Sequence, residues 1–288
     1  MYRQVKEELE KDDVQGCKNA VGTGVAPDKS NAGAGPNHDG TGTAQHGCAS
    51  EETKTSATSP KGRLQPIIAA TQAVRLTFSQ FFVSWSGVLT VVFTGLPPEL
   101  LQMKAQIDQE LPYLQTLKPE NPGSKWPKVS LAALRDGKRL SFEQLLKLKR
   151  ICRDSSKALA NERQLLVDKL SVVLFASCSL EETLSISNVP LLLPSSDSTP
   201  TDVELRNVEK VMDEFALDRL EQYWFYASKD GNSISHYRNP KLGATLVHFL
   251  QDFPQPLRAF RAAVDAELPD MYDWFRESAL HVTIRALS

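Results

Sequence analysis

The sequence predicts an α+β protein built from two related strand–helix–strand units. The main observation is an internal repeat, because residues 89–134 and 246–287 carry the same pattern of apolar run, proline, amphipathic stretch and final strand. A repeat of this length indicates a duplicated structural unit. We therefore expect a bilobal fold, in which two pseudo-symmetric lobes place their helices on one sheet face and enclose a central cleft.

Each repeat opens with an apolar run that is typical of a buried strand, Leu89–Phe93 in the first copy and Leu246–Leu250 in the second. A proline follows each run, and proline is well tolerated in the first turn of a helix. Apolar residues at matching helical intervals then predict helices over 98–111 and 254–268. Both helices end with the same sequence motif: Asp108-x-Glu110-Leu111-Pro112 and Asp265-x-Glu267-Leu268-Pro269.

The segments between the repeats give further elements. Residues 63–88 are apolar enough to join the core, but their pattern leaves helix and strand both open. A helix over 141–159 is indicated by a capping box of Ser141 and Gln144. The β-prone run 170–178 predicts a strand.

Prolines and serines in 186–200 favour a loop that connects the two lobes. Thr201 and Glu204 form a second capping box, which predicts a helix to about residue 217. The aromatic segment 221–227 is interpreted as a strand.

These elements divide the chain into a tail and one domain. Residues 1–62 are poor in bulky apolar side chains and are expected to form a disordered tail. Residues 63–288 are expected to form the two-lobed domain, with lobe one over 63–180, the connector over 186–200 and lobe two over 201–288.

Composition narrows the class of protein. The chain has 288 residues, 41% hydrophobic and 24% charged, which fits a soluble globular protein. A net charge of −2 excludes a strongly basic nucleic-acid binder, and no segment is apolar for long enough to span a bilayer. The acidic N-terminus resembles neither a signal nor a transit peptide, so we expect a cytoplasmic or nuclear protein. The sequence leaves the oligomeric state open, and a monomer is favoured.

The cysteines and histidines do not form a metal-binding pattern. His38, His46 and Cys48 lie close together, but their spacing matches no zinc site, and we expect neither a metal nor another cofactor. The four cysteines lack a C-x-x-C spacing and are expected to be free thiols: Cys17, Cys48, Cys152 and Cys178.

The final strand carries the strongest candidate for chemistry. Alternation along this strand predicts His281, Thr283 and Arg285 on one face, and the intervening apolar residues on the other, beneath the helix over 254–268. An imidazole can move protons near neutral pH, a hydroxyl can donate to a phosphate oxygen, and a guanidinium can neutralise the phosphate charge. This combination suits a phosphate ester.

The segment Ala279-Leu-His281-Val-Thr283-Ile-Arg-Ala-Leu287 resembles the His-x-Thr strand motif of the two-histidine (2H) phosphoesterases, the RNA-ligase-like and cyclic-nucleotide-phosphodiesterase-like proteins. The resemblance implies two lobes that each supply one His-x-Thr/Ser motif. One histidine would act as general base and the other as general acid, without a metal. It also implies 2′,3′-cyclic phosphates, 2′-5′ linkages or related RNA ends as substrates.

The first repeat departs from this motif. Lys128 stands where the second histidine is expected, although Ser130 keeps the hydroxyl. An unperturbed lysine has a pKa near ~10.4, so it binds phosphate well but moves protons poorly at neutral pH. His248 could replace the missing histidine, or it could be a buried core residue. A further lobe beyond Ser288 would be another source of a second histidine.

A basic run lies between the motifs. Residues 125–153 contain nine lysines or arginines and two acids, which could steer phosphates or could be a solvated helix face. Trp126 and Trp274 precede the two motif strands and could stack on bases or pack in the core.

Three hypotheses follow. The first is a 2H-type hydrolase in which His281 and Thr283 are catalytic, and Lys128, Ser130 and Arg285 bind the substrate phosphate. The second is a protein that binds RNA ends or cyclic nucleotides in the same cleft without turnover, as Lys128 would favour. The third is a scaffold protein in which the repeat serves only as architecture.

Overall fold

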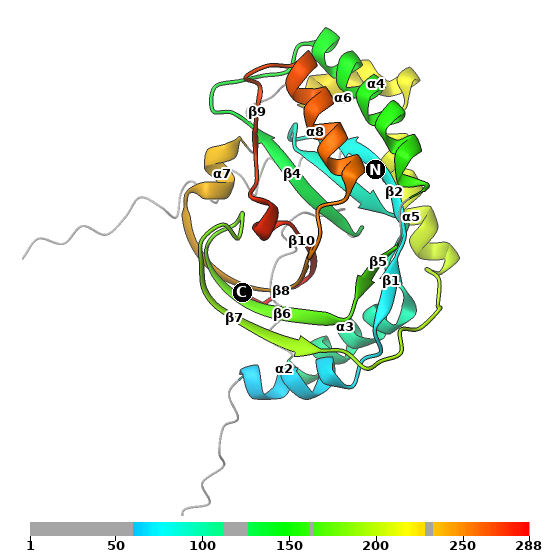
Figure 1. Cartoon of the computed structure of the whole chain (residues 1–288), viewed down its shortest axis with the longest axis vertical. Coiled ribbons are helices and arrows are strands. Elements are labelled where there is room, and N and C mark those ends of the chain that lie inside the picture. Colours follow the sequence, from blue (N-terminus) through cyan, green and yellow to red (C-terminus); the bar gives the residue numbers. More distant parts are fainter. Residues whose placement is uncertain (1–59, 112–125, 162–163, 228–232, 288) are drawn as a thin grey trace, which may run out of the picture. The chain divides into compact units, whose positions relative to one another are not determined.

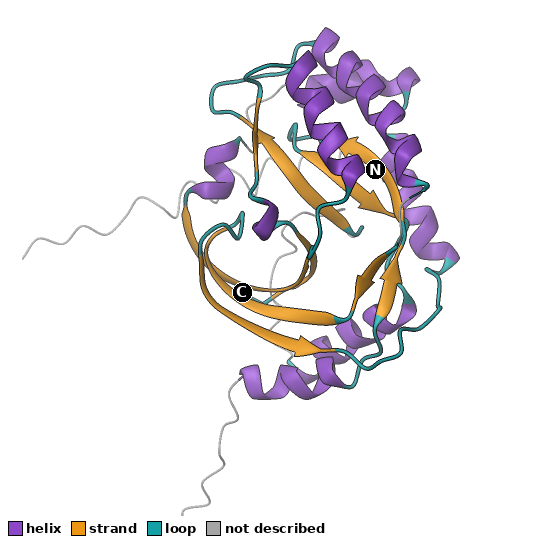
Figure 2. Cartoon of the chain, in the orientation of Figure 1, coloured by secondary structure: helices purple, strands orange, loops and turns teal. Residues whose placement is uncertain are grey.

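The computed structural model describes residues 60–111, 126–161, 164–227 and 233–287 of the chain. These residues form helices and antiparallel sheets, which confirms the α+β class (Figures 1 and 2). The expected tail lies outside the described residues except at its end, where helix α2 (Pro60–Ala69) begins.

Two four-stranded antiparallel sheets form the framework. The first sheet has the order β2-β3-β4-β9 and consists of β2 (Phe78–Val83), β3 (Leu89–Phe93), β4 (Lys128–Leu134) and β9 (Tyr272–Trp274). The second sheet has the order β10-β8-β6-β7 and consists of β10 (His281–Ala286), β8 (Pro240–Phe249), β6 (Lys169–Ser177) and β7 (Thr183–Pro190). A two-stranded sheet pairs β1 (Val74–Leu76) with β5 (Leu165–Val167).

Each four-stranded sheet has helices against one face (Figure 1). Helices α4 (Phe142–Leu159) and α8 (Gln255–Glu267) cover the first sheet, where Phe260 of α8 stacks on Phe81 of β2 with ring centroids 4.0 Å apart. Helices α2 and α3 (Pro98–Glu110) lie against the second sheet.

The expectation that the helix over 254–268 packs beneath the final strand is wrong. That helix, α8, covers the first sheet, and the helix against β10 is α3 from the first repeat. One reason for the position of α8 is the strand that follows it. This strand, β9, pairs with β4 of the first sheet. The two repeats therefore exchange their helices between the sheets.

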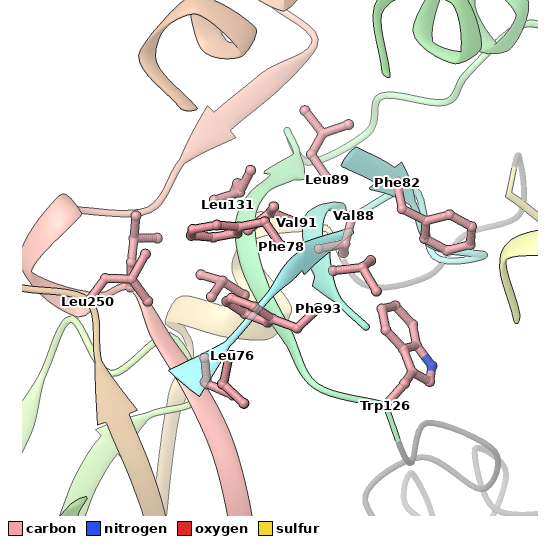
Figure 3. Packing of buried hydrophobic residues seen from close by; sticks show 14 of the residues in the cluster. Leu76, Phe78, Phe82, Val88, Leu89, Val91, Phe93, Trp126, Leu131 and Leu250 are labelled. Atoms are coloured by element: carbon pink, nitrogen blue, oxygen red, sulfur yellow. The ribbon is translucent and has the colours of Figure 1, made fainter. Parts of the chain in front are cut away.

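The hydrophobic core joins both sheets. Buried apolar side chains from the strands and helices form one large cluster, part of which is drawn in Figure 3. Phe81, Phe93 and Phe260 are among its fully buried members. A smaller cluster contains Val173, Phe175, Leu180 and Val247. Removal of this apolar surface from water is the main favourable contribution to folding.

Local signals in the sequence were reliable at two helix starts. Ser141 caps α4: its hydroxyl accepts a hydrogen bond from the Gln144 amide at 3.2 Å, and the Gln144 side chain accepts one from the Ser141 amide at 2.8 Å. Thr201 caps α5 (Asp202–Asp213) by accepting from the Glu204 amide at 3.4 Å. The helix expected to about 217 ends sooner, and a 3-10 turn (Leu217–Arg219) follows it.

The strand expected over 221–227 is wrong, because this segment is helix α6 (Leu220–Ala227). Leu220 and Tyr223 are buried and Trp224 is half-buried, at the spacing of one helix face. The Tyr223 hydroxyl donates to the Val83 carbonyl, and the Trp224 indole donates to the Leu140 carbonyl at 2.9 Å. Tertiary contacts therefore outweigh the β propensity of these aromatic residues.

The connector expected over 186–200 is only partly a loop, because its first residues belong to strand β7. Ile186 pairs with Val173 of β6, and β7 is the edge strand of the second sheet. Most of its side chains are exposed, so serine and asparagine are tolerated there, and the apolar signal of a strand is weak. The ambiguous segment 63–88 contains helix α2 and strands β1 and β2.

Candidate functional site

The two motif strands lie close together. Strands β4 and β10 belong to different sheets, but their Cα atoms come within 8 Å of one another. Figure 1 shows β10 near one end of β4. The structure thus brings the two motif strands, one from each repeat, into contact.

In the first sheet, the motif side chains face away from the covering helices. Phe81 pairs with Val91 and Val91 pairs with Val129, so these three side chains share the face on which Phe260 of α8 stacks. Side chains alternate along a strand, so Lys128 and Ser130 lie on the opposite face. Both are half-buried, whereas Val129 is fully buried.

The second sheet presents its motif in the same way. Val282 pairs with His248, and both are buried. Leu246 lies two residues before His248, so its side chain is on the same sheet face. Leu246 pairs with Arg285, and the Arg285 guanidinium contacts Asp108 of α3, so this face is the one toward α3. His281 and Thr283 therefore lie on the face away from α3, with Thr283 exposed and His281 half-buried.

Arg285 does not follow the alternation expected from the sequence. The register shifts between Thr283 and Arg285, so that Arg285 pairs with Leu246 after Thr283 has paired with Val247. Such a bulge redirects the side chain that follows it. The Arg285 guanidinium forms an ion pair with Asp108 at 2.9 Å, on the helix side of the sheet rather than beside His281.

The imidazole of His281 has a defined orientation. Its Nδ1 lies 2.7 Å from the Ala279 carbonyl oxygen, and a carbonyl can only accept, so Nδ1 carries the proton. In the neutral ring, Nε2 is then the nitrogen that can accept a proton. Burial lowers the pKa of His281, against a smaller raising effect of the bond to Ala279. The neutral form, which can act as a base, is therefore favoured at neutral pH.

Lys128 lies over an aromatic ring. Its ammonium is 4.2 Å from the ring centroid of Trp126, a favourable cation–π geometry. Trp126 is itself largely buried and packs edge-on against Phe82. Trp126 is thus part of the core and supports Lys128. Trp274 donates to the Asp265 carboxylate at 2.7 Å and packs against Phe260, so it too has a structural role.

His248 does not belong to the site. Its cross-strand partner Val282 places it on the sheet face opposite His281, where it is 1% exposed. Its Nδ1 donates to the Lys169 carbonyl at 2.9 Å, and its Nε2 is buried with no hydrogen-bond partner among the described residues. Burial lowers the pKa of His248. The interpretation as a buried core histidine is therefore the one that fits.

Much of the basic run is engaged elsewhere. Several of its members form ion pairs with acids: Arg135 with Asp270 and Asp273, Lys147 with Glu267, and Arg153 with Asp154. Lys149 donates to the Phe215 carbonyl and lies over the Phe215 ring. These pairings favour the interpretation of the run as a helix face with structural contacts.

One group that sequence reasoning missed is the carboxylate of Glu181. It lies in the turn between β6 and β7, and its side chain is only 4% exposed. The Arg238 guanidinium donates to both of its oxygens, at 2.6 and 3.3 Å. These residues lie 57 positions apart, so no local pattern in the sequence could have connected them.

In the described ranges, no group of three or more histidine, cysteine or acidic side chains could hold a metal ion. The cluster of His38, His46 and Cys48 lies outside those ranges. Cys152 and Cys178 are free thiols, and burial raises the pKa of Cys152 to about 12. None of the described helices is both long and apolar enough to cross a membrane.

No protein-family model, curated protein or solved structure matches the chain.

Proposed function

We propose that the protein is a 2H-type phosphoesterase that acts on 2′,3′-cyclic phosphates or RNA ends without a metal ion. The observation that carries this proposal is the hydrogen bond from His281 Nδ1 to the Ala279 carbonyl, which leaves Nε2 as a proton acceptor on the strand face that also carries the exposed Thr283. In this proposal the faces that carry the two motifs line a cleft between two related lobes.

The reaction would be the hydrolysis of a cyclic phosphodiester. His281 Nε2 removes a proton from water, the water oxygen bonds to phosphorus, and one of the two ring P–O bonds breaks. The proton returns to the oxygen that leaves, so the products are a phosphomonoester and a free hydroxyl. Thr283 donates a hydrogen bond to a non-bridging oxygen of the phosphate.

The strand β4 would supply the opposite wall. Lys128 stabilises the negative charge that develops on the phosphoryl oxygens, and Ser130 donates a second hydrogen bond. Arg285 was expected to bind the same phosphate, but its ion pair with Asp108 points to a role in holding β10 against α3. We therefore assign the positive charge of the site to Lys128.

The direct test is a panel of 2′,3′-cyclic nucleotides with a chelator present. We expect ring opening by the wild-type protein and a loss of about 100-fold or more in His281→Ala, since general acid–base catalysis contributes about 100- to 10,000-fold. His248→Ala is the matched control, because His248 is on the other face of the sheet. Activity that survives in His281→Ala would refute the proposal.

The second candidate is a binding protein that recognises the same phosphates without turnover. Lys128 favours it, because a lysine replaces the second histidine and its ammonium is already held over Trp126. This candidate predicts salt-sensitive RNA binding that Lys128→Ala weakens. Lys128→His separates the two candidates: hydrolysis should increase if the missing second histidine is the only defect.

A further inference from the structure

We propose that Glu181, held by Arg238, is a positioning residue that sets the orientation and tautomer of His281. The inference rests on the proposed function, in which His281 Nε2 is the proton acceptor. Glu181 has no part in the catalytic scheme, and its side chain is almost completely buried, with 4% exposed.

Glu181 bonds to the chain segment that leads into β10. One of its oxygens accepts a hydrogen bond from the Arg276 backbone amide at 2.9 Å, and both accept from Arg238. Arg276 is the residue that caps the 3-10 helix η3 (Glu277–Ala279). The carboxylate therefore fixes the start of the short helix that ends at Ala279.

Ala279 completes the connection to the imidazole. Its carbonyl oxygen accepts the Nδ1 proton of His281 at 2.7 Å, so the position of η3 determines where that acceptor lies. The connection runs from Arg238 through Glu181 and the Arg276 amide to η3, and from the Ala279 carbonyl to His281. A carboxylate–guanidinium pair with two hydrogen bonds is rigid and directional, which suits this role.

The neighbouring charges hold Arg238 in place. Arg238 also donates to the Trp274 carbonyl at 3.1 Å and lies 3.7 Å from the Asp273 carboxylate, which Arg135 contacts at 3.0 Å. Burial alone would raise the pKa of Glu181, but the hydrogen bonds from Arg238 and Arg276 lower it overall. Glu181 is thus ionised at neutral pH and keeps its bonds.

The experiment compares Glu181→Gln with Glu182→Gln in the full-length protein. Glu182 is the adjacent, exposed residue of the same turn, so its substitution controls for a change of charge. ¹⁵N NMR of the His281 ring, assigned with His281→Gln, measures which nitrogen carries the proton. We expect the Nδ1–H form to dominate in wild type and Glu182→Gln, and an increased share of the Nε2–H form in Glu181→Gln.

Turnover gives the second readout. In Glu181→Gln we expect kcat to fall about 10- to 100-fold with KM nearly unchanged, since a misplacement of ~1 Å costs on the order of 100-fold. If Glu181→Gln is poorly folded, Arg238→Lys keeps the charge but loses the two-pronged hydrogen bond, and the same shift is expected in weaker form.

The outcomes separate this inference from the proposed function. A folded Glu181→Gln variant whose His281 ring is identical to wild type would overturn the inference, even if the wild type hydrolyses cyclic phosphates. A changed tautomer in a protein without any turnover would support the positioning role and refute the proposed function.

Discussion

Arg285 of the last strand forms an ion pair with Asp108 in a helix of the first repeat. The Arg285 Nη2 atom lies 2.9 Å from the Asp108 Oδ1 atom. Asp108 and Asp265 occupy the same position in the repeated sequence motif, but Asp265 accepts a hydrogen bond from the Trp274 indole instead. The two copies thus use the same residue for different contacts.

This ion pair leads to a prediction about stability. Because both side chains are partly exposed, a double-mutant cycle of Asp108→Asn and Arg285→Gln should give a coupling free energy of about 0.5–1 kcal/mol in denaturant unfolding. The exposed pair of Arg258 and Glu277, 3.6 Å apart, is the control and should give a coupling near zero. The assignment of Arg285 to structure would be wrong if Arg285→Gln weakened phosphate binding and left stability unchanged.

A second prediction concerns stability against acid. The pKa of His248 is lowered by burial below its ordinary value of 6.5, so below about that pH the unfolded chain binds a proton that the folded chain resists. The contribution of His248 to the free energy of unfolding is therefore complete above the ordinary pKa, and it is lost as the pH falls from that value through the lowered pKa of the folded protein. We expect the free energy of unfolding to decrease from pH 7.5 to pH ~5.5, and to decrease less in His248→Leu. An identical decrease in both proteins would contradict this account.

The lowered pKa of His281 gives a third prediction, which depends on the proposed activity. A general base must be unprotonated, so kcat/KM should rise with pH through the pKa of His281 and then level off. Because burial lowers that pKa, the midpoint of the acid limb should lie below 6.5. A midpoint above the ordinary histidine value, measured with a cyclic nucleotide, would exclude His281 as the base in this environment.

A fourth prediction tests the exchange of helices. Phe260 is fully buried and stacks on Phe81, so Phe260→Ala should lower the free energy of unfolding by about 3–5 kcal/mol. Phe253, which precedes α8 and is half-buried, is the control and should cost clearly less when changed to alanine. Equal losses for the two variants would mean that α8 does not pack on the first sheet as described.

Much of the local structure could be predicted because its causes are local. The cap formed by Ser141 and Gln144 involves residues three apart, and the strand β4 has the alternation that places Lys128 and Ser130 together. The segment 221–227 failed for the opposite reason. Its helix is supported by contacts with Val83 and Leu140, which are far away in the sequence.

The candidate site was predictable only in part. The motif indicated His281 and Thr283 as candidates, and alternation placed these two side chains on one face of β10, as the structure has them. A bulge in β10 turns Arg285 toward Asp108, which lies on a helix far earlier in the chain, and no residue spacing within the strand indicates this bulge. Glu181 and Arg238 were missed because an ion pair between residues 57 positions apart has no sequence signature.

The sequence by itself determined the α+β class, most of the strands and helices, and the imidazole, hydroxyl and ammonium groups of the two motif strands. These features follow from interactions between residues a few positions apart, and such interactions are indicated in the sequence by hydrophobic periodicity and by helix-capping residues. The tertiary structure alone decided which helix covers which sheet and which face Arg285 takes. Those depend on distant segments that meet only when the core closes, because a buried carboxylate or carbonyl must find its partner wherever packing places one.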